Sequence, residues 1–522
     1  MKKFWALFLG VALLLTACGG GEKVAKSPDA DDLFVATYPT DILVKSPQGT
    51  VEASTKRVLR NMNEGIYRYD ENGELEFGIA KNVAAKKEGD YIVFDIELRD
   101  DVKFHNGKDL TSDDVKYSYE RLAGLVDGIG LDMVQGGGNF KNLLNGDEEE
   151  GYIKGKIEII DDYKLRLYVD SGYGILTSKH SLADGFLVPA NYSEDDQLEH
   201  PIGVGPYKFV EHKAGNYIRF ERFEDYYGEK PDLKNVEFRK YSDQSTIPLA
   251  FYSGEVNILN LNNENYEKVK DDDYPIVDGL SNDVRVLYMN QREGKLFSNK
   301  DLRIAFNHAI DKEKMLESIS SGRGAILDSH FTPFLKNYYN SDLKNFYKYD
   351  KKKAEKYLEK AGFNKEEVLV MKTVVENEIE QDIAALIIED LAQIGVKVKN
   401  DPIPWNVYYE EVYKKHNFDL TILNVVGYPD PFRMLSRYET TGSSNVPGFS
   451  NERYDQILKE IQALDNRDKE IEYYKELQRI LTEDAVGVFT IDPGMSVALS
   501  KGYDKYVISP FAYVNISSIK RR

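Results

Sequence analysis

The chain has 522 residues and a formal net charge of −20 at pH 7. A surface with this charge repels phosphates, and no basic stripe offsets it, which excludes nucleic acid as a natural partner. The length exceeds what one hydrophobic core fills, so at least two lobes are expected. The 36 tyrosines suit a large pocket that is both apolar and hydrogen-bonding, although compositional drift explains them equally well.

The N-terminal residues 1–17 have the three parts of a secretory signal peptide: two lysines, an apolar run and small residues. The apolar run is shorter than the roughly 20 residues of a membrane-spanning helix. It ends in LTAC, and Cys18 is the single cysteine of the sequence. LTAC resembles a bacterial lipobox, which implies acylation of Cys18 and a lipid anchor in the cell envelope, with residues 18–32 as a flexible tether. A plain secretory signal is the alternative.

From residue 31 onward strands and helices alternate, and the first half of the chain is rich in strands. The Asn72-Gly73 pair predicts a hairpin turn, and residues 90–98 alternate apolar and polar side chains as a strand does. Thr111 followed by Asp114 predicts a helix start with a capping box.

The second half is richer in helices. Amphipathic helices are predicted over residues 304–319, 351–363 and 378–395, and Gly395 marks the end of the last one. Its apolar stripe comprises Ile379, Ile383, Leu386, Ile387, Leu391 and Ile394. The strand character of residues 486–508 indicates that the chain returns to its first lobe, so the fold class is α/β.

The sequence contains none of the common catalytic motifs. A GxSxG nucleophile elbow, a phosphate loop ending in GK[ST] and an HExxH zinc helix are all absent. The acidic runs 147–150 and 271–273 lack EF-hand spacing, so solvated loops are the better interpretation. We therefore expect neither an enzyme nor a cofactor, and only a carboxylate pair for glycoside hydrolysis stays open.

Several segments follow one family pattern in chain order. They are NEGIYRYDENGELEFGIAKNV (63–83), LRDDVKFHNGKDLTSDDVKYSYERL (98–122), IGVGPYKF (202–209), FYSGEVNI (251–258) and LRIAFNHAIDKEKML (302–316). Together they resemble the extracellular solute-binding proteins of family 5, the oligopeptide, dipeptide and nickel binders of ABC importers. The resemblance holds in order and spacing from about residue 55 to residue 480.

The resemblance implies a two-lobed periplasmic-binding-protein fold of class II, the Venus-flytrap type, with an extra subdomain in the first lobe. Lobe I is expected over residues 33–262 plus 490–522, its subdomain over approximately 56–186, and lobe II over 263–489. A ligand held between the lobes stabilises their closed arrangement through contacts that the open one lacks. The family also implies a permease and an ATPase as partners of a monomeric binding protein.

The loop NVVGYPDPFRM (424–434) is where the resemblance places part of the ligand site. Peptide binders of the family often have an Asp here that pairs with the α-ammonium of the ligand. Aligning Asp430 and its following proline with the family pattern puts Gly427 at that position. The basic residues that peptide binders can carry nearby are also replaced, by Val412 and Thr421. A buried ammonium without a carboxylate costs several kcal/mol.

Three interpretations of this departure remain open. Asp430, or an acid from the other lobe, takes over the amine; or a peptide is held through its backbone and side chains; or the ligand is a metal chelate or a sugar. Asp430 also has a structural interpretation, slightly favoured, in which its carboxylate caps its own loop. Arg433 suits a ligand carboxylate as well as it suits Asp430 or another acid.

Further cleft residues follow from the resemblance. Trp405, the single tryptophan after the signal peptide, is expected to line the cleft and stack on a ligand. The full set of predicted ligand-binding residues is Tyr38, Thr40, Trp405, Asn424, Val426, Gly427, Tyr428, Asp430 and Arg433. The expected function is capture of a peptide or peptide-like solute for import; a nickel or sugar binder of the same family, and more distantly a cell-envelope hydrolase, are the alternatives.

Overall fold

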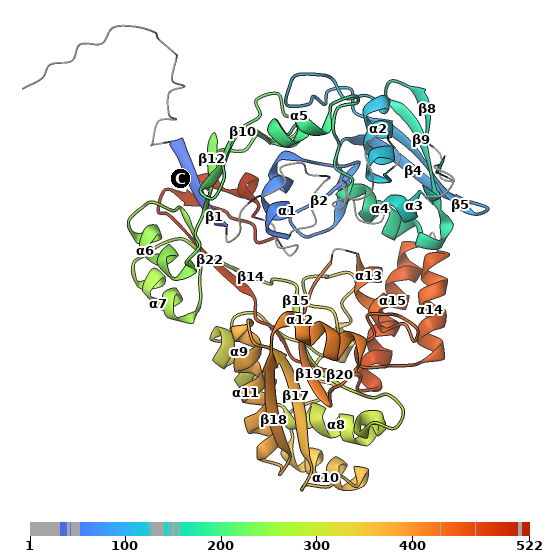
Figure 1. Ribbon diagram of the computed structural model, residues 1–522, viewed down its shortest axis with the longest axis vertical. Helices are drawn as coiled ribbons and strands as arrows, with labels where there is room; N and C mark the ends of the chain where they lie inside the picture. Colours follow the sequence, from blue (N-terminus) through green and yellow to red (C-terminus); the bar gives the residue numbers. More distant parts are fainter. Residues whose placement is uncertain are drawn as a thin grey trace, which may run out of the picture.

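The computed structural model describes residues 32–38, 42, 48, 53–124, 126, 140–144, 146–147, 152–153, 157–428, 430–464, 466–509 and 514–522. Cys18, the signal peptide, the tether up to residue 31 and Thr40 lie outside these residues. Two lobes stand one above the other, and strands and helices are mixed in both (Figure 1).

The first lobe is built on two small sheets. One has the strand order β1-β12-β11-β10, with β1 parallel to β12 and the other neighbours antiparallel; its strands are Leu33–Tyr38, Asn235–Lys240, Tyr217–Arg222 and Tyr207–Lys213. The other has the order β13-β22-β14, with strands Ile258–Asn260, Met495–Leu499 and Ile276–Gly279. Three helices accompany them: α1 (Ala53–Leu59), α6 (Ile247–Tyr252) and α7 (Asn263–Asp271).

A subdomain of the first lobe is built on the antiparallel sheet β4-β5-β9-β8. Its strands are Ala80–Glu88, Tyr91–Leu98, Lys164–Asp170 and Ile157–Asp161, its helices are α2 (Ser112–Leu122), α3 (Phe140–Leu143), α4 (Ile175–Asp184) and α5 (Glu194–Glu199), and its hairpin is β2 (Tyr67–Tyr69) with β3 (Leu75–Phe77). Two further two-residue strands, β6 (Gly146–Asp147) and β7 (Tyr152–Ile153), pair with each other.

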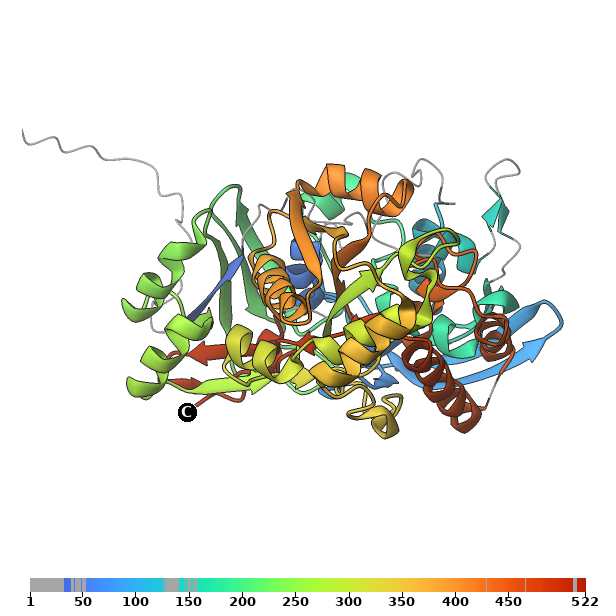
Figure 2. The ribbon, with the colours of Figure 1, turned by 90° about the horizontal axis from the view of Figure 1, so that it is seen from below.

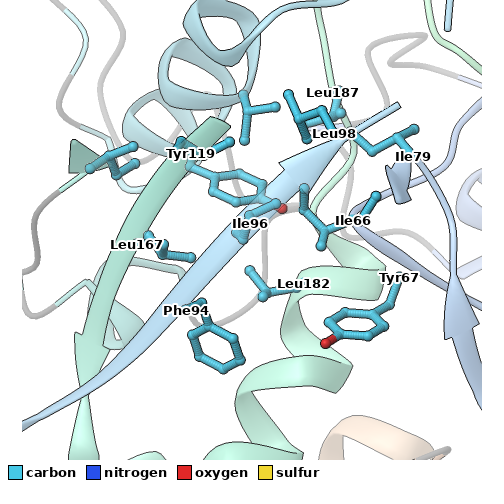
Figure 3. Packing of buried hydrophobic residues seen from close by; sticks show 14 of the residues in the cluster. Ile66, Tyr67, Ile79, Phe94, Ile96, Leu98, Tyr119, Leu167, Leu182 and Leu187 are labelled. Carbon is cyan, nitrogen blue, oxygen red and sulfur yellow. The ribbon is translucent and has the colours of Figure 1, made fainter. Parts of the chain in front are cut away.

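The sequence patterns of this subdomain are confirmed. Strand β5 covers the predicted alternation, and Phe94, Ile96 and Leu98 pack with Tyr119 of α2 and Leu182 of α4 (Figure 3). At the start of α2, Thr111 and Asp114 form the predicted capping box. Alternate side chains of a strand point to opposite faces, so one face of β5 builds this core.

The second lobe contains the five-stranded sheet β18-β17-β19-β15-β20. Its strands are Lys397–Ile403, Val368–Val374, Leu420–Val426, Asp283–Met289 and Gly487–Phe489. Leu287 and Met289 share one core with the helices α8 (Lys300–Ala309), α9 (Lys312–Ser320), α10 (Lys351–Ala361) and α11 (Glu378–Ala392). Val284 and Val286 share the core of the opposite face with α12 (Trp405–Tyr408), α13 (Pro431–Leu435), α14 (Glu452–Gln462) and α15 (Arg467–Glu483).

Two short segments join the lobes. The chain passes from β14 to β15 through residues 280–282 and returns from β21 (Ile491–Asp492) to β22 through residues 493–494. Strands β14 and β22 lie side by side and antiparallel (Figure 2). Strand β21 pairs with β16 (Ala325–Ile326), and after β22 the chain ends in the first lobe with β23 (Tyr503–Asp504) and β24 (Lys520–Arg521). The domain bounds predicted from the sequence stay a prediction.

The lobes also touch at the subdomain. Glu74, in the turn between β2 and β3, accepts hydrogen bonds from Arg467 of α15 and from Asn337, both at 2.7 Å. Lys336 donates to Asn72 at 3.0 Å. A cavity of about 290 Å³ lies at this contact and is lined from both lobes.

Candidate functional site

The carboxyl ends of β17, β18 and β19 meet at one edge of the second-lobe sheet. Strand β17 is parallel to both neighbours, so these ends are brought together. In open α/β sheets ligands bind outside the carboxyl ends of the strands. At this edge lie seven apolar side chains that are 37 to 53 % exposed, which we call the apolar platform: Val375, Ile379, Trp405, Val407, Tyr409, Val426 and Tyr428.

Trp405 is the most exposed member of the platform, at 53 %. It begins α12, directly after Pro404. Its ring stacks on Tyr408 at 5.8 Å between centroids, and Tyr409 stacks on Tyr413 at 5.5 Å. The indole packs on the buried Tyr408 and also contacts Tyr409 and Tyr413, and its exposed half suits stacking on a ligand.

Gly427 is where the family resemblance would place a carboxylate, and its surroundings leave no room for a side chain. A Cβ on Gly427 would lie 2.1 Å from Nδ2 and 2.4 Å from the carbonyl oxygen of Asn282. The Gly427 amide donates a 2.7 Å hydrogen bond to that same carbonyl oxygen. The end of β19 is thus held against the segment that joins the lobes, and this close approach is a physical reason for glycine.

Asp430 caps its own helix. Its carboxylate accepts a 3.0 Å hydrogen bond from the amide of Phe432 in α13, as an N-cap does. The side chain is 7 % exposed, and burial raises the pKa of Asp430 to about 6 despite backbone hydrogen bonds and the hydroxyl of Thr177 of α4. The carboxylate is therefore engaged between its own helix and the first lobe.

The remaining predicted residues are spread over different surroundings. The guanidinium of Arg433 lies 3.9 Å from the ring centroid of Tyr428, a cation–π contact, and it also acts electrostatically on Asp430. Asn424 is half-buried in β19, and Val426 is exposed. Tyr38 is 3 % exposed and packs in the core of the first lobe. Thr40 lies outside the described residues.

The helical stripe predicted over residues 378–395 is correct for most of its length. Ile383, Ile387 and Leu391 of α11 are fully buried. Ile379 differs, because it lies in the first turn of α11, beyond the edge of the sheet, and is 37 % exposed. It belongs to the platform instead of the core.

No sequence pattern indicated the cluster of charged residues that lies beside the platform. Asp283 and Arg285 of β15 form an ion pair with 2.7 Å between Oδ2 and Nη2, and their side chains are 16 % and 6 % exposed. Glu380, in the first turn of α11, is 2 % exposed. Burial raises the pKa of Glu380 to about 7. These residues come from two distant segments, so no sequence spacing links them.

Within the described part of the chain, no three His, Cys, Asp or Glu side chains gather as a metal site would require. Among the same residues, no helix has both the length and the apolar character needed to cross a bilayer.

Comparisons with known proteins identify the family to which this architecture belongs. Residues 76–445 match the profile of the bacterial extracellular solute-binding proteins, family 5. The oligopeptide-binding protein AppA of Bacillus subtilis is 24 % identical over 539 aligned residues, which cover 97 % of this chain and 95 % of AppA. The nickel-binding protein NikA of Staphylococcus aureus is 23 % identical over 395 aligned residues, which cover 72 % of this chain and 68 % of NikA.

Solved structures agree with the fold. The ABC transporter substrate-binding protein CtaP of Listeria monocytogenes has a TM-score of 0.79 and 21 % identity, over 94 % of this chain and 99 % of CtaP. NikA of Brucella suis, in complex with Fe(III)-EDTA, has a TM-score of 0.80 and 18 % identity, over 94 % and 100 % of the two chains. The profile match spans more than half of the sequence, and the chain therefore belongs to the bacterial extracellular solute-binding proteins of family 5.

Proposed function

We infer that this protein captures a peptide or peptide-like solute between its lobes and delivers it, chemically unchanged, to a permease and an ATPase in the membrane. The observation that supports this most directly is the apolar platform at the carboxyl ends of the second-lobe strands β17, β18 and β19. Monomeric soluble proteins rarely expose large apolar patches unless a ligand or partner covers them. Aromatic and aliphatic surfaces suit the side chains and backbone of a peptide.

Binding of an intact peptide is tested with the chain freed of its signal peptide. This mature protein is first stripped of bound ligand by unfolding and refolding. A pool of synthetic pentapeptides is then added stepwise while the fluorescence of Trp405 is followed. We expect a saturable change, and chromatography that recovers every peptide uncleaved. A Trp405→Phe variant loses the signal, and calorimetry then reports the contribution of the indole to affinity.

Two results would contradict the proposal. One is cleavage of the peptides, which would make the protein an enzyme. The other is absence of any saturable change, with mass spectrometry of protein purified from its own host finding a metal chelate or a sugar between the lobes. Either outcome would leave the family and the fold unchanged; the first would replace the binding function and the second would replace the solute.

Anchoring is a separate part of the proposal. The lipobox-like LTAC supports removal of residues 1–17 and acylation of Cys18, with residues 18–32 as the tether to the outer face of a membrane. We expect the protein to be a monomer there. Mass spectrometry of the mature N-terminal peptide checks the lipid, and Cys18→Ala is expected to release the protein from the membrane fraction. A retained Cys18→Ala protein would exclude the anchor.

A further inference from the structure

The turn between β2 and β3, residues 70–74, has a shape fixed by its own hydrogen bonds. One carboxylate oxygen of Asp70 accepts from the amide of Asn72 at 2.9 Å and from the amide of Glu74 at 2.8 Å. The amide of Gly73 donates to the carbonyl oxygen of Asp70 at 3.1 Å, and Gly73 has a φ of +77°. Because the turn is rigid before any contact forms, presenting Asn72 and Glu74 to a partner surface costs little conformational entropy.

That partner surface belongs to the second lobe. The carboxylate of Glu74 is shared between two donors, since Oε1 accepts from Asn337 and Oε2 from Arg467, both at 2.7 Å. The segment that contains Asn337 is fixed to the helix that contains Arg467, because the carbonyl oxygen of Tyr338 accepts from Gln478 of α15 at 2.7 Å. Glu74 therefore contacts one continuous unit of the second lobe.

We call the five residues of this contact the latch: Asn72 and Glu74 on the turn, and Lys336, Asn337 and Arg467 in the second lobe. It lies far from the segments that join the lobes. Figure 1 shows α14 and α15 beneath the subdomain on one side of the molecule, and β14 and β22 on the other side. Turning about residues 280–282 and 493–494 separates the parts farthest from those segments most, so the lobes cannot open while the latch is intact.

The buried contacts beside the latch are incomplete. The hydroxyl of Thr177 on α4 donates to Asp430, and Lys179 of the same helix acts electrostatically on Glu470 of α15. Between these elements lies the cavity of about 290 Å³ that both lobes line. Side chains at a void lose the dispersion contacts that close packing supplies. The polar contacts of the latch therefore contribute a large part of what holds the lobes together at this end.

The latch is strong enough to shift an equilibrium and weak enough to open. The side chains of Glu74 and Arg467 are 33 % and 60 % exposed, and exposed ion pairs shift an equilibrium by about two- to fivefold. Two further hydrogen bonds, from Asn337 to Glu74 and from Lys336 to Asn72, add to this. None of the five residues belongs to the apolar platform, so the latch forms independently of what the platform binds.

We propose that the latch keeps the ligand-free lobes closed, so that opening of the latch, and not diffusion, sets the rate at which a solute enters and leaves. This rests on the proposed function, which supplies the solute. A protein that is mostly closed binds its ligand only during the fraction of time that it is open. Because the same contact closes the empty and the filled protein, the latch slows association and dissociation alike and leaves the affinity unchanged.

Scattering tests the latch without any solute. The mature protein is stripped of ligand, and its radius of gyration is measured by small-angle X-ray scattering in about 20 mM and about 0.5 M NaCl, since salt screens exposed ion pairs. We expect the unaltered protein to be compact at low salt and to expand at high salt. Glu74→Arg, which places a cation beside Arg467 and Lys336, is expected to be expanded at both salt concentrations.

Two further variants exclude a general effect of charge. Glu71→Arg is the matched control, because Glu71 lies in the same turn, is exposed and has no ion pair among the residues that the structure describes. It should scatter as the unaltered protein does. The swap of Glu74→Arg with Arg467→Glu restores the opposite charges and should return the protein to its compact form at low salt.

Stopped-flow fluorescence of Trp405 measures the rates with one pentapeptide that binds the unaltered protein. In Glu74→Arg we expect the association and dissociation rate constants to rise by a similar factor, about three- to tenfold, with the dissociation constant unchanged within about twofold. Glu71→Arg should leave both rate constants as they are, and the swap should bring them back. A residue that contacts the ligand would change the affinity instead.

Each outcome decides one of the two proposals. If no pentapeptide binds the unaltered protein, the proposed function fails, and scattering still tests the latch. The latch proposal is wrong if ligand-free Glu74→Arg scatters as Glu71→Arg does, or if the swap fails to restore the compact form. It is also wrong if Glu74→Arg binds with an unchanged association rate constant, because opening would then not limit entry.

Discussion

At the scale of single residues, the contact between Gly427 and Asn282 decides what the loop 424–434 can do. Asn282 has a φ of +55°, a conformation that Asn tolerates better than most residues. In this conformation its carbonyl oxygen accepts from Gly427, and its side chain fills the space where a Cβ would stand. The glycine is therefore a structural requirement of the contact with the connecting segment 280–282, and it excludes a carboxylate at the position where the family resemblance predicts one.

A first prediction follows for Gly427→Asp. We expect the free energy of unfolding to fall by about 1–3 kcal/mol, because the new side chain overpacks the contact with Asn282. Urea denaturation followed by circular dichroism measures it. Gly502→Asp is the matched control, since a Cβ there meets nothing within 4 Å. An unchanged midpoint for Gly427→Asp would show that the loop moves away from the hinge at little cost.

At the scale of elements, local patterns in the sequence predicted much and long-range contacts very little. The strand around Phe94 and the helix start at Thr111 were predictable because alternation and capping depend on neighbours in sequence. The self-capping of Asp430 was foreseen for the same reason. The cluster of Asp283 and Glu380 was not, because only the register of β15 and β19 and the position of α11 bring these residues together.

The two segments that join the lobes, residues 280–282 and 493–494, are held together by one carboxylate. Asp492 is fully buried and accepts hydrogen bonds from the hydroxyl of Ser281 at 2.7 Å, the amide of Asn282 at 3.0 Å and the amide of Gly494 at 2.9 Å. It thus ties both connecting segments to each other. Donors left buried without an acceptor cost about 1–3 kcal/mol each.

A second prediction concerns Asp492→Ala. We expect a lower unfolding temperature and a larger radius of gyration in small-angle X-ray scattering, because the connecting segments lose their common acceptor. Asp278→Ala is the control: Asp278 joins β14 to β22 through Ser496 but is exposed and lies within the first lobe. If both variants scatter alike, the angle between the lobes is set elsewhere.

At the scale of the whole molecule, two carboxyl groups lie at the contact between the lobes. Burial raises the pKa of Asp430 to about 6, and burial together with the charge of Asp430 raises that of Glu470 to about 7. Lys179 of the first lobe faces Glu470, and burial lowers the pKa of Lys179. Each raised carboxyl binds its proton more tightly in the folded protein than in the unfolded chain.

A third prediction gives the sign of the pH dependence. Between about pH 4 and 7 the folded protein holds more protons at Asp430 and Glu470, so their contribution to stability is present at low pH and is lost as the pH rises through this window. Asp430→Asn with Glu470→Gln should flatten the fall in unfolding temperature from pH 5 to pH 8. Glu472→Gln, on the same helix and exposed, is the control. An equal fall in the double variant would exclude Asp430 and Glu470 as the source of the pH dependence.

The pairing of β14 with β22 has a consequence for transport. Because β14 and β22 are paired where they lead into the two connections, both connections leave the first lobe side by side, which favours turning of the second lobe about one line. Solutes of different bulk are then met by the same two surfaces and differ in the angle at which turning stops. Under the proposed function, that angle is the geometric signal by which the permease would distinguish a filled carrier from an empty one, without touching the cargo.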